Sequence, residues 1–125
     1  MKIKTLMAVL AVSISGALAT GASAAERTPT TVTIEAESGG FYGEVLSSDE
    51  GNCADGRKVT LFKLVGSTPD RSVDQKIATD TASANGSDYM WSTGNTGQRK
   101  GKFYARVAKT SLCGGDISPV IRAQP

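Results

Sequence analysis

The sequence predicts an all-β protein, an antiparallel β-sandwich of about seven strands held by one disulfide. Two observations favour this fold class. Apolar and polar residues alternate with a period of two in short runs, and these runs are separated by turn-forming Gly, Pro, Asn and Asp residues. After the first 25 residues, no stretch of ten or more shows helical periodicity. A closed barrel is the alternative architecture.

The first residues have the pattern of a secretory signal peptide. Lys2 and Lys4 give a short positive start, an uncharged apolar stretch follows, and small residues come next. Cleavage is expected after Ala24 or Ala25. An uncleaved anchor is the weaker alternative, because the apolar stretch is shorter than the roughly 20 residues that a spanning helix needs.

The signal peptide divides the chain into three predicted parts. We expect a signal peptide at residues 1–24, a linker at 25–31 and a single β-sandwich domain at 32–125. The product is then secreted, or extracytoplasmic, with no membrane span after cleavage. Release into the medium and retention on the cell surface are both compatible with the sequence.

Charge gives little support for a nucleic-acid partner. The chain has 14 Lys and Arg against 12 Asp and Glu, but Lys2 and Lys4 lie in the predicted signal peptide, so the remaining chain is formally neutral. Nucleic-acid binding would require a clustered positive surface. The only local cluster is Arg99-Lys100-Gly101-Lys102, which is typical of a solvated turn; a small anion site there is the alternative.

Two cysteines predict one disulfide. Cys53 and Cys113 would meet in an oxidising compartment, where such bonds persist. Two free thiols, a metal pair or an intermolecular bridge are the alternatives. A metal pair lacks support because the sequence has no histidine to complete it. We expect the bond to be structural, joining the loop before one strand to the loop before the last.

The alternating runs place the strands. One run has apolar residues on both faces, with Val59, Leu61 and Val65 opposite Phe62 and Leu64, which predicts a central strand. Extended segments are expected at 31–36, 41–47, 59–65, 75–81, 87–91, 102–108 and around 120–121.

The dipeptide Asn85-Gly86 is the sharpest local signal. Both residues tolerate positive φ, which a two-residue type I′ turn requires, so the flanking strands are expected to pair antiparallel.

Several segments together resemble a known family. They are Gly43-Glu44-Val45, Arg57-Lys58-Val59-Thr60-Leu61-Phe62, Thr79-Asp80 ahead of Asn85-Gly86 and Tyr89, Gly101-Lys102-Phe103-Tyr104-Ala105, and a late cysteine. Over residues 41–121 this resembles the secreted bacterial modules of the transthyretin-like, carboxypeptidase regulatory-like group, within the wider Ig-like sandwich class. The resemblance implies a non-catalytic domain. Hydrolases of the transthyretin-like fold that act on a purine-degradation intermediate depend on histidines, which this sequence lacks.

The remaining acidic residues offer weak candidates for chemistry. Paired carboxylates at Glu35 and Glu37, or at Asp49 and Glu50, are typical of solvated surface rather than of an acid–base pair. Oxygens for Ca²⁺ are available at Asp80, Asn85 and Asp88, but without EF-hand spacing, and Asp and Asn favour turns in their own right. We expect no catalytic residue, no cofactor and no metal.

Three aromatic residues are the candidate ligand contacts. Tyr89, Trp91 and Tyr104 would stack on sugar rings or anchor a protein partner if they were exposed. Core packing is the favoured interpretation of Trp91, and exposure is expected more for Tyr89 or Tyr104.

These patterns predict a secreted, non-catalytic β-sandwich module with a structural or interaction role at the cell surface or in the medium. The alternative is a small carbohydrate-binding domain that uses exposed aromatics. A cell-envelope protein or a polysaccharide is the expected kind of partner.

Overall fold

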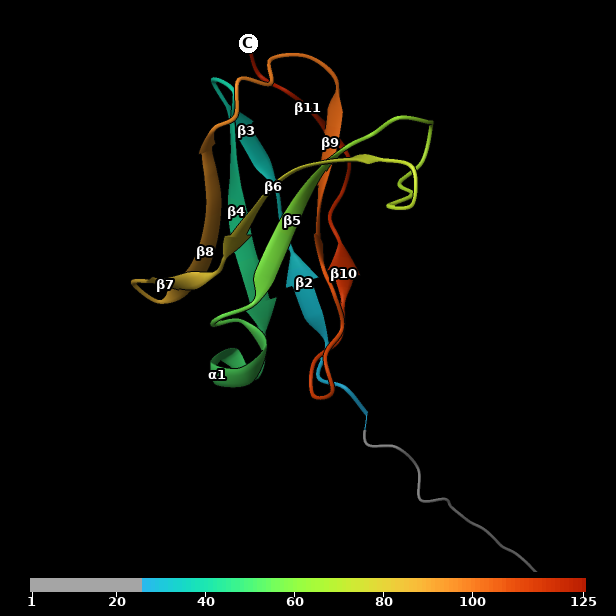
Figure 1. Ribbon diagram of the computed structural model, residues 1–125. Helices are drawn as coiled ribbons and strands as arrows, with labels where there is room; N and C mark the ends of the chain where they lie inside the picture. The colour runs from blue at the N-terminus through green and yellow to red at the C-terminus, as the bar shows by residue number, and fades with distance from the viewer. Residues whose placement is uncertain (1–25) are drawn as a thin grey trace, which may run out of the picture.

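Two antiparallel β-sheets face each other in the computed structural model, which describes residues 26–125 (Figure 1). The predicted all-β sandwich with one disulfide is confirmed. The predicted signal peptide, residues 1–24, and its cleavage site lie outside the described residues.

One sheet is built around strand β9, and we call it the β9 sheet. Its five strands run in the order β10, β9, β5, β6, and β11 pairs with the other half of β9. Their bounds are β5 Lys58–Lys63, β6 Gln75–Thr81, β9 Lys102–Val107, β10 Asp116–Ile117 and β11 Ile121–Arg122.

The other sheet is built around strand β4, and we call it the β4 sheet. It has the order β2, β4, β8, β7, and β3 pairs with β4 beyond the end of β2. Its strands are β2 Thr30–Val32, β3 Glu35–Glu37, β4 Gly40–Ser47, β7 Ser83–Asn85 and β8 Asp88–Asn95. The chain changes sheets between β6 and β7 (Figure 1).

The first predicted strand, 31–36, forms two short strands instead of one. The interruption is at Thr33, whose hydroxyl accepts a hydrogen bond from the backbone N–H of Glu44 at 2.8 Å and whose carbonyl accepts the indole N–H of Trp91 at 3.0 Å. Each of these two hydrogen bonds joins a side-chain group to a backbone group, unlike the backbone–backbone bonds of a continuous β-ladder. Strand β2 also begins at Thr30, inside the stretch 25–31 that was predicted to be a linker.

The central strand is shorter than the pattern 59–65 predicted. Strand β5 ends at Lys63, and Val65 is 66% exposed in the connection that follows. Lys63 extends over the ring of Phe103, with its Nζ 5.8 Å from the ring centroid.

The hairpin at residues 83–95 forms as predicted, but with a different turn. Asn85 pairs with Asp88, so the two turn residues are Gly86 and Ser87. Of these only Gly86 has a positive φ, 67°. A glycine at the first central position is the arrangement of a type II′ turn, not the type I′ turn expected from Asn85-Gly86.

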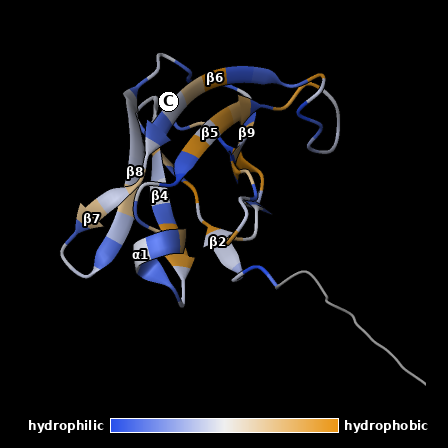
Figure 2. Cartoon of the chain, turned by 60° about the horizontal axis from the view of Figure 1, so that its bottom comes forward, coloured by the Kyte–Doolittle hydropathy of each residue, from blue (hydrophilic) through white to orange (hydrophobic). Residues whose placement is uncertain are grey.

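The core lies between the two sheets. Phe41 of β4 and Phe103 of β9 meet with their ring centroids 4.6 Å apart. Burial of each such side chain contributes about 1.5–3 kcal/mol. Figure 2 shows hydrophobic residues, in orange, along β5 and β9 of the β9 sheet, whereas helix α1 is mainly hydrophilic. The other fully buried core residues are Val32, Val45, Ala54, Val59, Leu61, Ala82, Trp91, Ala105 and Val107.

A four-residue helix, α1 (Glu50–Cys53), lies between β4 and β5 and brings Cys53 to one end of the sandwich (Figure 1). Within residues 26–125, no helix is long and apolar enough to span a membrane.

Candidate interaction surface

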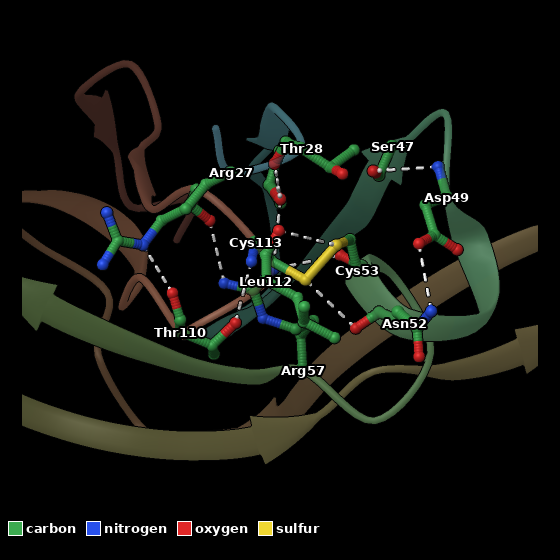
Figure 3. Close-up of a disulfide and its surroundings, with 12 residues drawn as sticks. Arg27, Thr28, Ser47, Asp49, Asn52, Cys53, Arg57, Thr110, Leu112 and Cys113 are labelled. Atoms are coloured by element: carbon green, nitrogen blue, oxygen red, sulfur yellow. Dashed lines mark hydrogen bonds between the residues drawn. A yellow bond between two sulfur atoms is a disulfide. The ribbon is translucent and has the colours of Figure 1, made fainter. Parts of the chain in front are cut away.

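The predicted Cys53–Cys113 disulfide is present at the α1 end of the sandwich (Figure 3). It joins α1, just before β5, to the loop between β9 and β10, and closes a loop of 60 residues. Cys53 is 0% exposed and Cys113 is 1% exposed. A bond sealed from water is inaccessible to thiol reductants, so its role is structural.

Arg57 lies beside the disulfide and is itself buried (Figure 3). Its guanidinium donates to four oxygens: the Thr30 hydroxyl at 3.1 Å and the carbonyls of Cys53, Ala108 and Gly114 at 3.1, 2.7 and 3.0 Å. Burial lowers the pKa of this guanidinium, although an arginine stays charged at neutral pH. Arg57 therefore joins the N-terminal segment, α1 and the loop after β9 at one point.

The N-terminal segment is fastened to the same place. Thr28 forms a parallel bridge with Cys113, and its backbone N–H donates to the Leu112 carbonyl at 2.9 Å. The Arg27 Nε donates to the Thr110 carbonyl at 2.6 Å (Figure 3). Residues 27–30 are therefore held by the fold.

Tyr104 is 0% exposed, which contradicts the expectation of an exposed ring. It faces outward from β9, and its ring stacks on Phe62 of β5 at 5.4 Å between centroids. The phenol donates to the Asp74 carboxylate at 2.5 Å, and that carboxylate also accepts the backbone N–H groups of Val65 and Asp70 at 2.9 and 2.7 Å. The connection 64–74 is thereby tied down against the outside of the β9 sheet.

The pKa values of this pair move in opposite directions. Burial raises the pKa of Asp74, but the hydrogen bonds from Tyr104, Asp70 and Val65 outweigh it, so the net pKa is below the usual range. Burial and the adjacent Asp74 carboxylate raise the pKa of Tyr104. At neutral pH the pair is a carboxylate bound by a neutral phenol.

Trp91 is a core residue, 1% exposed, as the favoured interpretation had it. Its indole reaches the Thr33 carbonyl across β4, where residue 43 is glycine. A Cβ built on Gly43 would lie 2.1 Å from that carbonyl oxygen and 2.9 Å from the Trp91 Nε1. Only glycine allows this approach. Tyr89 is half-buried and packs against the core. The three predicted aromatics therefore do not form an exposed platform.

The acidic candidates are also placed. The Asp80 carboxylate accepts the backbone N–H of Ser92 at 2.8 Å, so it links β6 to β8 instead of turning toward Asn85 and Asp88. Asp49 accepts a hydrogen bond from the Asn52 amide at 3.0 Å, beside Glu50 in α1. Among residues 26–125, no group of three or more acidic or cysteine side chains is arranged to hold a metal ion.

The strands of the β4 sheet carry only acidic charge on their outer face. Inside the described strands of this sheet, all four charged residues are acidic, and strand alternation places each of them outward. The apolar or aromatic side chains on the same face are Tyr42, Met90 and Leu46, of which Leu46 is 43% exposed. We call this surface the acidic face: Glu35, Glu37, Tyr42, Glu44, Leu46, Asp88 and Met90.

Tyr42 lines a shallow hollow on the acidic face. The hollow has a volume of about 290 Å³, and Glu37, Ser92 and Asn95 also line it. The Tyr42 phenol donates to Glu35 at 3.2 Å, and this hydrogen bond raises its pKa. Sequence reasoning did not single out Tyr42. Its position beside buried Phe41, in an alternating strand, was the signal that one of the two rings faces outward.

The outer face of the β9 sheet carries basic charge. Five basic residues point outward from its strands, and Ile117, 48% exposed, lies opposite Arg106. Lys102 and Arg122 are direct cross-strand neighbours, and like charges directly opposite are destabilising. We call this surface the basic face: Lys58, Lys76, Lys102, Arg106, Ile117 and Arg122.

The two acidic residues in the strands of the β9 sheet do not offset that charge on its outer face. Asp80 and Asp116 each turn toward the β4 sheet, where the Asp80 carboxylate accepts the N–H of Ser92 and the Asp116 carboxylate accepts the N–H of Val32, both at 2.8 Å. The sandwich is therefore polarised, with one acidic and one basic outer face.

Comparison with protein-family models and with curated proteins finds no match to this chain.

Proposed function

We propose that this protein is a secreted, non-catalytic β-sandwich module of the transthyretin-like, carboxypeptidase regulatory-like type, with a structural or interaction role at the cell surface or in the medium. We propose further that it contacts a positively charged partner surface through the acidic face. The observation that carries this proposal is the segregation of charge, with Glu35, Glu37, Glu44 and Asp88 on one outer face.

The composition of the acidic face supports a contact surface. Protein surfaces usually carry positive and negative charges side by side. A sheet face with charges of one sign has a stronger electrostatic potential, which steers an oppositely charged partner toward it. Leu46 and Met90 provide apolar area among the carboxylates, and interfaces combine such apolar centres with a polar rim.

The buried disulfide and the signal-like leader support secretion. A buried Cys53–Cys113 bond is typical of proteins that fold in an oxidising compartment. The lack of histidine in the sequence supports a non-catalytic role, because it removes the general base of Ser-His and Cys-His enzymes.

The experiment is co-sedimentation of the purified protein with cell envelope from its own source. The test variant replaces Glu35, Glu37 and Glu44 with Gln, and its control replaces Glu50 and Asp55, acidic residues outside the strands, with Gln. We expect the wild type and the control to sediment with the envelope and the test variant to stay in the supernatant. Equal retention of all three proteins would contradict a role for the acidic face.

Carbohydrate binding is a second candidate, favoured by the hollow at Tyr42. A half-exposed ring beside Glu37 and Asn95 offers a stacking surface and hydrogen-bonding groups of the kind that sugars need. Tyr42→Ala should abolish retention on the polysaccharide fraction of the envelope, whereas Tyr89→Ala, at a ring that packs on the core, should retain it if the fold is intact. Retention by Tyr42→Ala equal to that of the wild type would exclude this candidate.

A further inference from the structure

We propose that the partner of the acidic face is a second copy of this chain, which docks through its basic face, so that copies associate head to tail. This inference rests on the proposed function and names the occupant of the same surface. The first argument for it is charge complementarity. Four carboxylates face outward from the β4 sheet, and five basic side chains face outward from the β9 sheet.

The second argument is local. Lys102 and Arg122 stand directly opposite each other on β9 and β11, and both are exposed. Both acidic residues of the covering connection already have partners: the Asp74 carboxylate is bound to Tyr104 and to two backbone N–H groups, and the Asp70 carboxylate accepts from Ser72. A pair of like charges that destabilises the free molecule becomes favourable when carboxylates of another molecule lie against it.

Each face also carries an exposed apolar side chain next to a charge. Leu46 follows Glu44 on the same side of β4, and Ile117 is the cross-strand neighbour of Arg106. A shallow hollow of about 290 Å³ adjoins Ile117 and is large enough to receive a leucine side chain; Arg106, Lys109 and Asp116 also line it. We infer that Leu46 of one copy packs at this hollow of the next.

The geometry determines the kind of assembly. The two faces are on opposite sides of a packed sandwich, so they cannot meet within one molecule. An acidic face on a basic face is a heterologous contact, so a pair of copies keeps one free face of each kind and can add further copies. The connection 64–74 covers Phe62 and Tyr104 on the basic face. The proposed contact between two copies therefore uses the basic side chains next to this connection, together with Ile117. The rotation between successive copies decides whether such an assembly closes into a ring or grows as an open chain, and in both cases it depends on salt.

The test is sedimentation equilibrium of protein produced from the full-length sequence, with two neutralised variants. The first replaces Glu35, Glu37 and Glu44 with Gln and so keeps the basic face. The second replaces Lys102, Arg106 and Arg122 with Gln and so keeps the acidic face. The control replaces Glu50 and Asp55 with Gln.

We expect the average mass of the wild type and of the control to rise with concentration, and the association to weaken about tenfold or more between about 0.02 M and about 0.5 M NaCl. Each neutralised variant alone should remain a monomer. Their equimolar mixture should form a dimer and stop there, because only one intact pair of faces remains.

Two results would overturn the inference: a wild type that stays monomeric at low salt and high concentration, or a mixture that fails to dimerise although both variants fold with the circular dichroism spectrum of the wild type. A monomeric wild type that still sediments with envelope through the acidic face would leave the proposed function intact and assign the face to a different partner.

Discussion

The α1 end of the sandwich and the acidic face use their polar residues in opposite ways. At the α1 end, a disulfide and a buried arginine with four acceptors hold the N-terminal segment and two loops together. On the acidic face, Glu37, Glu44 and Asp88 are directed to solvent. Polar groups that stabilise the fold are buried and bonded, so the outward carboxylates are the ones available for contacts.

This difference predicts that substitutions at the α1 end lower stability, whereas substitutions on the acidic face change association and leave stability nearly constant.

The largest effect is expected at the disulfide. Replacing both Cys53 and Cys113 with Ala should lower the free energy of unfolding by about 2–5 kcal/mol, because the unfolded chain loses a 60-residue loop constraint. Urea denaturation measures this loss, and two titratable thiols in untreated wild-type protein would contradict the presence of the bond.

Arg57 should come next. Arg57→Met removes the guanidinium and leaves the Thr30 hydroxyl and three carbonyls without their donor, at a cost of about 3 kcal/mol. Arg71→Met, at an exposed site in the connection 64–74, is the matched control and should stay within about 0.5 kcal/mol of the wild type. Equal stability of the two variants would show that the buried guanidinium is not a structural centre.

The connection 64–74 should give a smaller effect that depends on pH. Asp74→Asn places an amide N–H against groups that themselves donate, so the Tm at pH 7 should fall by about 5 °C or more. Asp70→Asn is the control, because its side chain accepts only from Ser72 at the surface.

The sign of the pH dependence follows from the lowered pKa of Asp74. Its contribution to stability is complete above the unfolded pKa of about 3.9 and is lost as the pH falls through the lower folded pKa. The Tm of Asp74→Asn should therefore fall less steeply than that of the wild type between about pH 4 and about pH 2. Parallel Tm curves in calorimetry would contradict a coupling between this carboxylate and folding.

The smallest effect on stability is expected on the acidic face. Replacing Glu35, Glu37 and Glu44 with Gln should change the free energy of unfolding by less than about 0.5 kcal/mol, because none of these side chains bonds a buried group. A loss of several kcal/mol in urea denaturation would mean that these carboxylates stabilise the fold. Their position on one face would then be explained by folding alone, without a binding partner.

Local patterns in the sequence were sufficient for the fold class, the disulfide and the hairpin. Period-two alternation identified β4, β6 and β9 closely, and the strand 75–81 was predicted with the bounds it has. The turn type was wrong because the register of the hairpin depends on the pairing of Asn85 with Asp88, which the dipeptide alone does not determine.

Long-range contacts explain what the sequence did not reveal. Tyr104 alternates correctly to the outer face, but its burial depends on the connection 64–74, which Asp74 ties down from 30 residues away. The acidic and basic faces were hidden for a similar reason. Alternation tells which side chains lie on the same side of one strand, but it does not tell which sheet the strand joins. The consecutive strands β6 and β7, for example, belong to different sheets. The charges separate only when the strands are sorted by sheet.

The most direct measurement of the central claim is zero-length carbodiimide cross-linking, which joins a carboxylate to an amine only where the two are in contact. An equal mixture of ¹⁵N-labelled and unlabelled protein distinguishes links between molecules from links within one. We expect mixed-isotope links that join Glu35, Glu37 or Glu44 to Lys58, Lys76 or Lys102, and we expect them to disappear at high salt. Links confined to single molecules, or links between molecules that avoid the acidic face, would contradict the account.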